Sequence, residues 1–495
     1  MTGLGLEQSD RALFERYIGA LPPEDIEHIY AAGDELTAVL AEAGADKPPT
    51  VMVAYGGGKD SSFALAFMRG VQWYLRGTKG VDFHLRVATF RHAGMPRAVM
   101  ENVDRAYTAL GMYDDPSCEM LVLDGETVRP FSVGLELPDA VVARGRRDIL
   151  MTGHRCAGDG RPTFCNACNL NMVRTFGAAA AWGDGVDVIV TGDSTPEQRD
   201  YYRWTTRLAA SLKLEKPSEP RAPFRRLLDM FDGIGEAYSA DVHGTKRDDF
   251  AAESLQEVKN GLTFFSIYNH TAYESGAHWE FLSDYLGFVF DEIAFSFSES
   301  DCGNPGLMAH MRGLKAERVF GRSYADGIGE YVGFATRLMA KKDFPEHLVE
   351  RMRKRYETAD GIRAMRHLME KYLFEAHRIS EQELECMLFA PFVDGAKSLD
   401  NYVERVAPEL VGDIASVRSH LEDPGLAVPS AVDALCLLSG LTPTQMRHLY
   451  NSDSIGSAPS DSLLRAVLRD DPYKEVISTQ DEPGGPQRLE LISGR

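Results

Sequence analysis

The sequence has few of the features that mark secreted, membrane-spanning or nucleic-acid-binding proteins. It contains seven cysteines in 495 residues, which argues against a disulfide framework and favours a reducing, cytoplasmic location. It has no run of about 18 apolar residues, so we expect no membrane span. Its first residues lack the basic start and apolar core of a secretion signal.

Positive charge is also scarce. The chain has 53 Lys and Arg residues against 74 Asp and Glu, which gives a net charge of −21. Nucleic acid requires a positive surface, so this balance makes nucleic acid a less favoured partner than a small molecule or a carrier-bound group.

Hydrophobic residues make up 44% of the sequence, which is enough for a large core. The length predicts two or three domains. Apolar residues at helical spacing predict an N-terminal helical segment over residues 1–48, which Pro22 and Pro23 divide in two. An α/β domain is expected over 49–330, a helical domain without a recognisable chemical motif over 331–477, and a loosely ordered tail over 478–495. In the helical domain the expected helices are 331–341, 345–358, 362–376 and 381–389.

Between residues 51 and 190, short β-branched runs alternate with helical stretches. The predicted strands are 51–54, 83–89, 119–123 and 186–190. The predicted helices between them are 63–77, 96–111 and 169–183. This alternation predicts an α/β fold with a parallel sheet and helices on both faces. Ligands bind at the carboxyl ends of such strands, where residues 56–62, 90–94 and 192–194 would meet.

The most specific motif follows the first predicted strand. Its residues are Gly56, Gly57, Gly58, Lys59, Asp60, Ser61 and Ser62. Glycines let backbone N–H groups approach an anion, and a helix that begins here adds its free amides and the positive end of its dipole. We interpret the segment as a phosphate-binding loop, although its spacing differs from the G-x-x-x-x-G-K-[ST] loop. The alternative is a tight strand–helix turn without a ligand.

A second motif is Cys165-Asn166-Ala167-Cys168, whose spacing lets both thiolates bind one metal. Cys302 lies far downstream, and Cys156 or His154 would complete a tetrahedral set unless the fourth position stays open. The same spacing also suits a redox pair or two thiols without a role. The remaining cysteines, Cys118, Cys386 and Cys436, are expected to be buried.

The Gly-Gly-Lys-Asp-Ser loop after a strand resembles the pyrophosphate loop of the N-type ATP pyrophosphatases (PP-loop enzymes), which cleave ATP between the α and β phosphates. The resemblance spans about residues 49–320. The C-x-x-C motif, Arg174, the strand before Thr191-Gly192, and Cys302 with Arg312 occur in the order seen in the tRNA-thiolating, 2-thiocytidine synthetase-like branch. It implies an adenine nucleotide alpha-hydrolase-like, Rossmann-like fold.

The chain departs from the family pattern in three respects. Gly56 stands where the family has a serine, and Asp193 stands where it has a histidine. The acid pair behind that histidine is replaced by Ser194-Thr195-Pro196-Glu197-Gln198. These differences put the acceptor substrate in question more than the ATP chemistry.

The resemblance also implies roles for individual residues, with ATP and Mg²⁺ bound at the loop. The glycines and Ser61 would hold the β and γ phosphates, Lys59 would neutralise the departing pyrophosphate, and Asp60 would hold Mg²⁺ or orient the loop. Asp193 would bind Mg²⁺ or substrate, or would equally be a helix N-cap. Further nucleotide contacts are expected at Ala54, Tyr55, Ser62, Thr89, Phe90 and Gly192. Cys165, Cys168 and Cys302 would hold zinc or a [4Fe-4S] cluster.

The implied reaction converts ATP to AMP and pyrophosphate while it adenylates a carbonyl or carboxylate oxygen, which a nitrogen or sulfur nucleophile then replaces. No cysteine follows Met1, so we expect no internal glutaminase. Nitrogen would come from free ammonia, an amine or a donor partner protein, and a sulfur donor protein is the corresponding partner for sulfur transfer. One alternative is a tRNA-thiolating sulfurtransferase with a Cys-bound Fe–S cluster. Another is a non-catalytic nucleotide-binding scaffold. The chain is also compatible with a homodimer.

Two basic groups complete the set of candidates. Arg91, His92 and Arg97 follow the second strand and are expected mainly at the surface, with phosphate contacts as the alternative. A second group would form either a substrate wall or an ordinary amphipathic helix. It consists of Arg199, Tyr201, Tyr202, Arg203, Trp204 and Arg207.

Overall fold

The computed structural model describes most of the chain. The described residues are 6–42, 47–125, 127–192, 195–214, 223–245, 258–271, 278–291, 293, 304–341, 344–423, 425–426, 428–459, 462–469 and 474–493.

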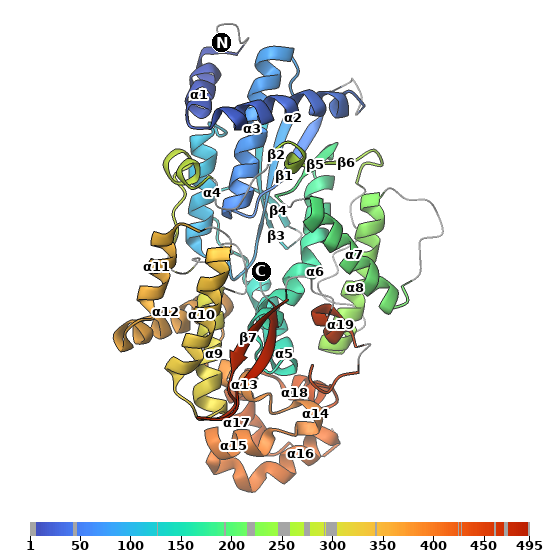
Figure 1. Cartoon of the computed structure of the whole chain (residues 1–495). Coiled ribbons are helices and arrows are strands. Elements are labelled where there is room, and N and C mark those ends of the chain that lie inside the picture. Colours follow the sequence, from blue (N-terminus) through green and yellow to red (C-terminus); the bar gives the residue numbers. More distant parts are fainter. Residues whose placement is uncertain are drawn as a thin grey trace.

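A six-stranded, mostly parallel sheet forms the centre of the α/β part (Figure 1). Strand β1 (Thr50–Ala54) lies in its middle and pairs in parallel with β2 (His84–Arg91) on one side and β5 (Val188–Val190) on the other. The sheet continues to β3 (Cys118–Asp124) and the antiparallel edge strand β4 (Thr127–Pro130) on one side, and to β6 (Thr263–Phe265) on the other. The four predicted strands are therefore confirmed, whereas β4 and β6 were not predicted.

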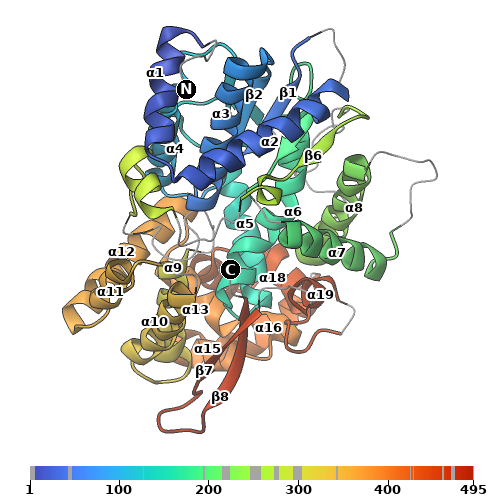
Figure 2. The same cartoon turned by 45° about the horizontal axis from the view of Figure 1, so that its top comes forward.

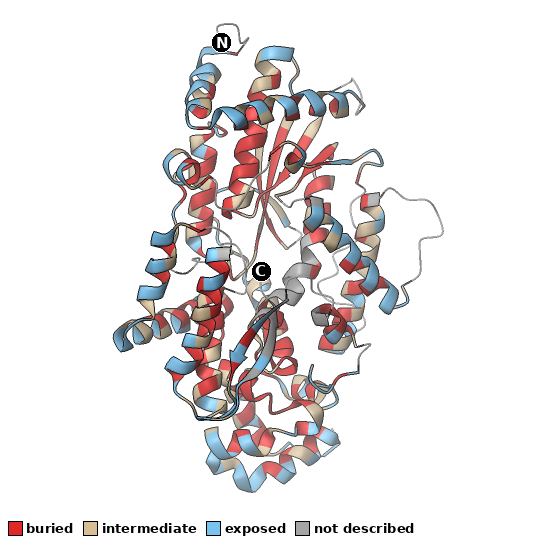
Figure 3. Ribbon diagram, viewed as in Figure 1, coloured by how far each residue is buried: buried red, intermediate tan, exposed pale blue. Residues whose placement is uncertain are grey.

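Alternation of side chains along the strands explains how both faces of the sheet are covered. Val51 and Val53 belong to one buried cluster with α3 (Lys59–Lys79) and α4 (Arg97–Ala109). Met52 belongs to a second cluster on the opposite face, with α6 (Gly160–Ala181). Strands buried on both faces read as continuous apolar runs, which is why β1 was recognisable. The expected helices on both faces are confirmed, and Figure 3 shows the buried sheet between them.

The N-terminal segment forms two helices, α1 (Gln8–Gly19) and α2 (Pro23–Glu42), as predicted. Tyr17 of α1 packs on Trp73 of α3, with 5.5 Å between the ring centroids. Figure 2 shows α2 crossing the helical layer on this side of the sheet. The segment thus completes the cover of one face.

Four helices on the other side of the sheet connect its strands. They are α5 (Asp139–Arg155), α6, α7 (Thr195–Ser211) and α8 (Pro223–His243). Helix α6 extends further toward the N-terminus than the predicted 169–183.

Helices predominate in the described residues beyond β6, and the four helices expected between 331 and 389 are confirmed. They correspond to α10 (Tyr324–Lys341), α11 (Glu346–Arg355), α12 (Ala359–His377) and α13 (Glu381–Phe389). The expected boundary between residues 330 and 331 falls inside α10. The other helices are α9 (Pro305–Leu314), α14 (Val393–Ala396), α15 (Leu399–Val406), α16 (Ile414–Glu422), α17 (Ser430–Ser439), α18 (Pro443–Tyr450) and α19 (Leu463–Arg469).

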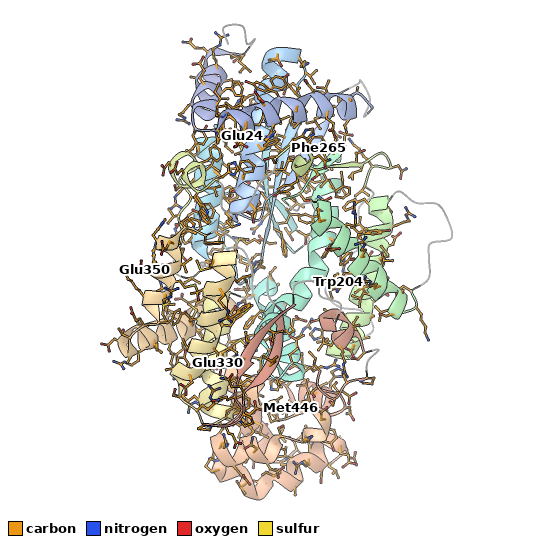
Figure 4. The ribbon with its side chains drawn as sticks, in the orientation of Figure 1. Glu24, Trp204, Phe265, Glu330, Glu350 and Met446 are labelled. Atoms are coloured by element: carbon orange, nitrogen blue, oxygen red, sulfur yellow. The ribbon has the colours of Figure 1, made fainter. Side chains whose placement is uncertain are left out.

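The expectation of loose order over 478–495 is wrong for the residues that the structure describes. Strands β7 (Lys474–Thr479) and β8 (Arg488–Ser493) form an antiparallel hairpin. The Pro-Gly-Gly-Pro stretch is its turn, with Gly484 at a φ of 71°. Thr479 anchors the hairpin to α10, because its hydroxyl donates a 2.9 Å hydrogen bond to Glu330 (labelled in Figure 4).

Candidate functional site

The glycine loop joins β1 to α3 in the middle of the sheet. Tyr55 N–H donates a 2.9 Å hydrogen bond to the carbonyl of Ala88, which holds the end of β1 against β2. Gly57 has a φ of 75°, and Gly58 is the extended N-cap of α3. Because Gly58 has no side chain, it cannot cap the amides of the first helical turn, and these amides are available to an anion.

Gly57 is required by packing as well as by conformation. A Cβ atom at this position would lie 2.6 Å from Val99 Cγ1 and 2.9 Å from Val103 Cγ2, both on α4. An L-residue would also be strained at this positive φ. The loop is thus held close to α4.

The two serines have different environments. Ser62 is buried, and its hydroxyl lies 2.8 Å from the carbonyl of Gly58 and 3.0 Å from the hydroxyl of Tyr55. Burial raises the pKa of Tyr55, an effect that the hydrogen bond to Ser62 opposes. Ser61 is half-buried and donates to the same carbonyl at 3.1 Å. Ser62 therefore supports the loop from within, and Ser61 is the better candidate for contact with a phosphate.

Lys59 and Asp60 form an ion pair at the start of α3. Lys59 is only 2% exposed, and its Nζ lies 2.6 Å from Oδ1 of Asp60, whose side chain is 46% exposed. The ring of Phe344, just before α11, lies 5.8 Å from the same Nζ. A buried cation therefore stands beside the loop, covered by a residue from the helical part of the chain.

The end of β5 meets this site, as the parallel sheet predicts, and Thr89 lies in the neighbouring strand β2. A Cβ atom at Gly192 would lie 3.4 Å from Ser61 Cα, so the end of β5 contacts the start of α3. Tyr268 holds Gly192 by donating a 2.8 Å hydrogen bond to its carbonyl. Thr89 is buried, and its hydroxyl lies 3.4 Å from that of Tyr107. Asp193 lies outside the described residues.

Among the basic residues after β2, the surface position expected for Arg91 is wrong. Arg91 is buried and makes two hydrogen bonds to the carboxylate of Asp124, at 2.7 and 2.9 Å. It also donates to the carbonyl of Glu136. These partners engage Arg91 within the fold, because Asp124 on the neighbouring strand is itself buried. Arg97 is exposed as expected and pairs with Glu101. His92 is half-buried.

Helix α7 is an amphipathic helix, and a substrate wall of its aromatic residues is not supported. Tyr201 packs inward on Phe231, with 5.9 Å between the ring centroids, and Trp204 is buried. The residues at four-residue spacing on the other face, Arg199, Arg203 and Arg207, are exposed. Tyr202 is exposed as well.

The cysteine pair lies on α6, where Cys165 and Cys168 are one turn apart, but their side chains are outside the description, as is all of Cys302. Within the described part of the chain, no group of three or more His, Cys, Asp and Glu residues is placed to hold a metal ion. Cys386 is buried as expected, whereas Cys118 and Cys436 are only half-buried.

The two residues considered as completing ligands are engaged in the core. His154 Nδ1 lies 2.7 Å from the carbonyl of Leu150, its Nε2 lies 3.6 Å from Cys386 Sγ, and burial lowers its pKa to about 4. Burial also raises the pKa of the Cys156 thiol, which disfavours the thiolate that a metal requires. Neither residue is a suitable ligand in this arrangement.

A different histidine, which the sequence did not indicate, lies beside the cysteine helix. His377 ends α12, is 2% exposed, and has its ring 5.2 Å from that of Phe164 on α6. Neither of its ring nitrogens has a hydrogen-bond partner among the described residues. Burial, with a smaller contribution from His92, lowers its pKa to about 3. Only tertiary contact brings it to α6, so no local sequence pattern could have indicated it.

Comparisons of the chain with protein-family models, with curated proteins and with solved structures found no match. No helix in the described residues combines the length and the apolar character needed to cross a membrane.

Proposed function

We propose that the chain is a PP-loop type enzyme that converts ATP to AMP and pyrophosphate in order to adenylate a carbonyl or carboxylate oxygen. The observation that carries this proposal is the three-glycine loop, with Lys59 and Asp60, between β1 and the uncapped start of α3. The acceptor would be a small molecule or a carrier-bound group, and a nitrogen or sulfur nucleophile would replace the activated oxygen.

The order of the strands supports this position for a ligand. When the five parallel strands are numbered by their order in the chain, they lie in the order 3-2-1-4-5 across the sheet. Successive strands are therefore added on one side of β1 first, and then on its other side. Ligands of doubly wound sheets bind at such a switch point, outside the carboxyl ends of the strands. A Rossmann-like, adenine nucleotide alpha-hydrolase-like fold is part of the proposal.

The residues allow the following chemistry. The substrate oxygen attacks the α phosphorus, the bond to the bridging oxygen breaks, and pyrophosphate leaves with the electron pair. The amides after Gly58 and the charge of Lys59 would stabilise the negative charge on that leaving group. The nucleophile then attacks the activated carbon, and AMP leaves with the oxygen. Positioning and charge neutralisation carry most of such a step.

Mg²⁺, when bound, would neutralise phosphate charge. Asp60 fits this role, because its carboxylate is partly exposed beside the loop.

The test is to measure binding of Mg²⁺ with α,β-methylene-ATP by calorimetry, and the products formed from ATP by chromatography. Lys59→Ala and Asp60→Asn should weaken binding or pyrophosphate release at least tenfold. Lys79→Ala, at the exposed far end of α3, is the matched control and should change neither. Full pyrophosphate release in Lys59→Ala, or ADP as the product, would contradict the proposal. Tight binding without any AMP would support the non-catalytic scaffold instead.

A second candidate, tRNA thiolation, is favoured by the exposed face of α7 that carries Arg199, Arg203 and Arg207. This helix begins just after the loop that contacts Ser61, so bound RNA would lie near the site. Replacement of the three arginines by glutamate should then abolish salt-sensitive RNA binding. If the wild-type chain does not bind RNA, this candidate is excluded.

A further inference from the structure

Tyr268 connects the end of β6 to the end of β5, beside the glycine loop. It lies in the short helix Ile267–Asn269, which follows β6 at the carboxyl edge of the sheet. Its hydroxyl donates a 2.8 Å hydrogen bond to the carbonyl of Gly192, two residues beyond the end of β5. The parallel pairing of β5 with β6 brings the two residues together, so no local sequence pattern could have indicated Tyr268.

Gly192 in turn lies against the first turn of α3. A Cβ atom at Gly192 would be 3.4 Å from Cα of Ser61 and 3.6 Å from its backbone nitrogen. The N–H of Ser62 donates to the carbonyl of Gly58, which makes it the first helical hydrogen bond of α3, and the N–H of Ser61 precedes it. Gly192 therefore borders one of the backbone amides that the start of a helix presents to an anion.

The glycine at position 192 leaves space beside this amide. Its φ lies outside the left-handed region, and a Cβ atom would meet Ser61 at ordinary van der Waals distances. Neither backbone strain nor overlap with the protein therefore requires a glycine here. A side chain would instead occupy the space next to the N–H of Ser61, so its absence suits the close approach of a ligand.

Because Gly192 has no side chain, its position must be fixed through its backbone. The preceding residue, Thr191, is fixed by its side chain, whose hydroxyl accepts a 3.0 Å hydrogen bond from Gln198 on α7. The carbonyl oxygen of Gly192 carries partial negative charge and would repel a phosphate if the peptide turned toward it. The hydrogen bond from Tyr268 fixes the direction of this carbonyl.

The segment that carries Tyr268 is itself anchored on both sides. Ile267 is fully buried in the cluster on the α3 face of the sheet. The Nε2 atom of His270 lies 2.9 Å from the carboxylate of Glu35 on α2. Tyr268 is therefore a fixed point from which the end of β5 can be positioned.

We propose that Tyr268 is a positioning residue of the phosphate site. Through the carbonyl of Gly192, it holds the backbone after β5 in the position that leaves the amide of Ser61 open to a phosphate oxygen. The inference rests on the proposed function and adds to it a residue outside the sequence motifs. Tyr268 takes no part in bond formation or cleavage.

The test is calorimetric titration of the full-length protein, in the presence of Mg²⁺, with two probes: α,β-methylene-ATP and inorganic pyrophosphate. Tyr268→Phe keeps the ring and removes only the hydroxyl. It should weaken the binding of both probes about fivefold to tenfold, as expected for the loss of one hydrogen bond. The binding stoichiometry should stay unchanged, whereas a merely structural role would lower the stoichiometry and leave the affinity of the folded molecules unaltered.

A rescue variant and a matched control complete the test. Replacement of Tyr268 by 4-aminophenylalanine puts an N–H donor in place of the hydroxyl and should restore most of the affinity. Tyr285→Phe is the control, because the hydroxyl of Tyr285 also donates to a backbone carbonyl, that of Ala109, at 3.4 Å. Ala109 is the last residue of α4, at the end remote from the glycine loop, so this change should leave both affinities unaltered.

Wild-type affinity for both probes in a folded Tyr268→Phe variant would overturn the proposal and leave the proposed function standing. Weaker binding of α,β-methylene-ATP alone would also overturn it, because Tyr268 would then act on the nucleoside. A wild-type protein that binds neither probe would overturn both proposals. If Tyr268→Phe weakens both probes but the wild-type protein forms no AMP from ATP, the positioning role stands and the adenylation reaction does not.

Discussion

Phe344 lies with its ring 5.8 Å from the ammonium of Lys59, although the two residues are far apart in the sequence. Phe344 also packs on Trp279, with 4.9 Å between the ring centroids, and Trp279 packs on Phe290 at the same distance. Two segments, 278–291 and the one that contains Phe344, thus form an aromatic cluster beside the glycine loop. The environment of the lysine is set by the helical part of the chain as much as by its own strand and helix.

We expect Phe344→Ala to destabilise the protein by about 3 kcal/mol, because it removes a buried aromatic side chain and leaves a cavity. Urea unfolding measures the change in the free energy of unfolding. Phe374→Ala is the control, since Phe374 is 55% exposed on α12 and its loss should cost less than about 1 kcal/mol. Equal effects of the two changes would show that Phe344 is not packed as described.

We expect Gly57→Ala to destabilise by about 3 kcal/mol, from strain at positive φ together with overlap with Val99. Gly80→Ala, at the other end of α3, is the control, because Gly80 also has positive φ (62°) but no atom within 4 Å of the added Cβ. It should cost only about 1 kcal/mol. When Val99 is already alanine, the added Gly57→Ala change should reduce the free energy of unfolding by less than it does in the wild-type protein. Equal costs of Gly57→Ala in the two backgrounds would contradict this explanation.

Glu330 is the largely buried partner of two arginines, with distances of 2.9 Å to Arg312 and 2.7 Å to Arg322. We expect Glu330→Gln to cost about 3 kcal/mol or more, because it leaves two desolvated cations without a counter-charge. Hydrogen exchange should also accelerate in β7 and β8, since the hydrogen bond from Thr479 loses its charged acceptor. Glu350→Gln, whose ion pair with Lys354 is exposed, should change stability by less than about 1 kcal/mol (Figure 4). A hairpin with unchanged exchange rates in Glu330→Gln would refute this anchoring role.

Burial lowers the pKa of His310 to about 4, below the ordinary value of about 6.5. The folded state therefore favours the neutral ring, whose Nδ1 lies 2.7 Å from the hydroxyl of Tyr324. Its contribution to stability is complete above about pH 6.5 and is lost by about 1.4 kcal/mol per pH unit as the pH falls toward 4. We expect His310→Gln to show a shallower loss of unfolding free energy over this range. Identical pH slopes in both proteins would show that His310 does not titrate this way.

The parts of the fold that are contiguous in sequence could be predicted, and those that depend on distant contacts could not. The apolar run before Gly56 gave β1, and the glycine loop was recognisable because all its residues are consecutive. Strand β4 was missed, although Asp124-Gly125 before it is a common hairpin signal, with Gly125 at a φ of 64°. Strand β6 has only three residues, too few to show a pattern.

The same distinction applies to the candidate site: contacts that follow from strand order could be predicted, and contacts made by distant segments could not. Strand pairing brings Gly192 to Ser61 and Ala88 to Tyr55, as a parallel sheet requires. Phe344 and His377 approach through the packing of helices, which leaves no local signal. The burial of Arg91 was missed because its partner, Asp124, lies on the next strand along the chain.

The buried cluster that begins at Met52 and Ile189 in the sheet continues without a break through α9 and α13 to Met446 of α18. Such continuity couples the sheet thermodynamically to the C-terminal helices. If the chain were cut after the sheet, apolar surface would be exposed to water on both fragments. We therefore expect neither fragment to persist as a soluble, independently folded unit. Heat or urea should accordingly unfold the strands of the sheet and the distal helices in a single cooperative transition.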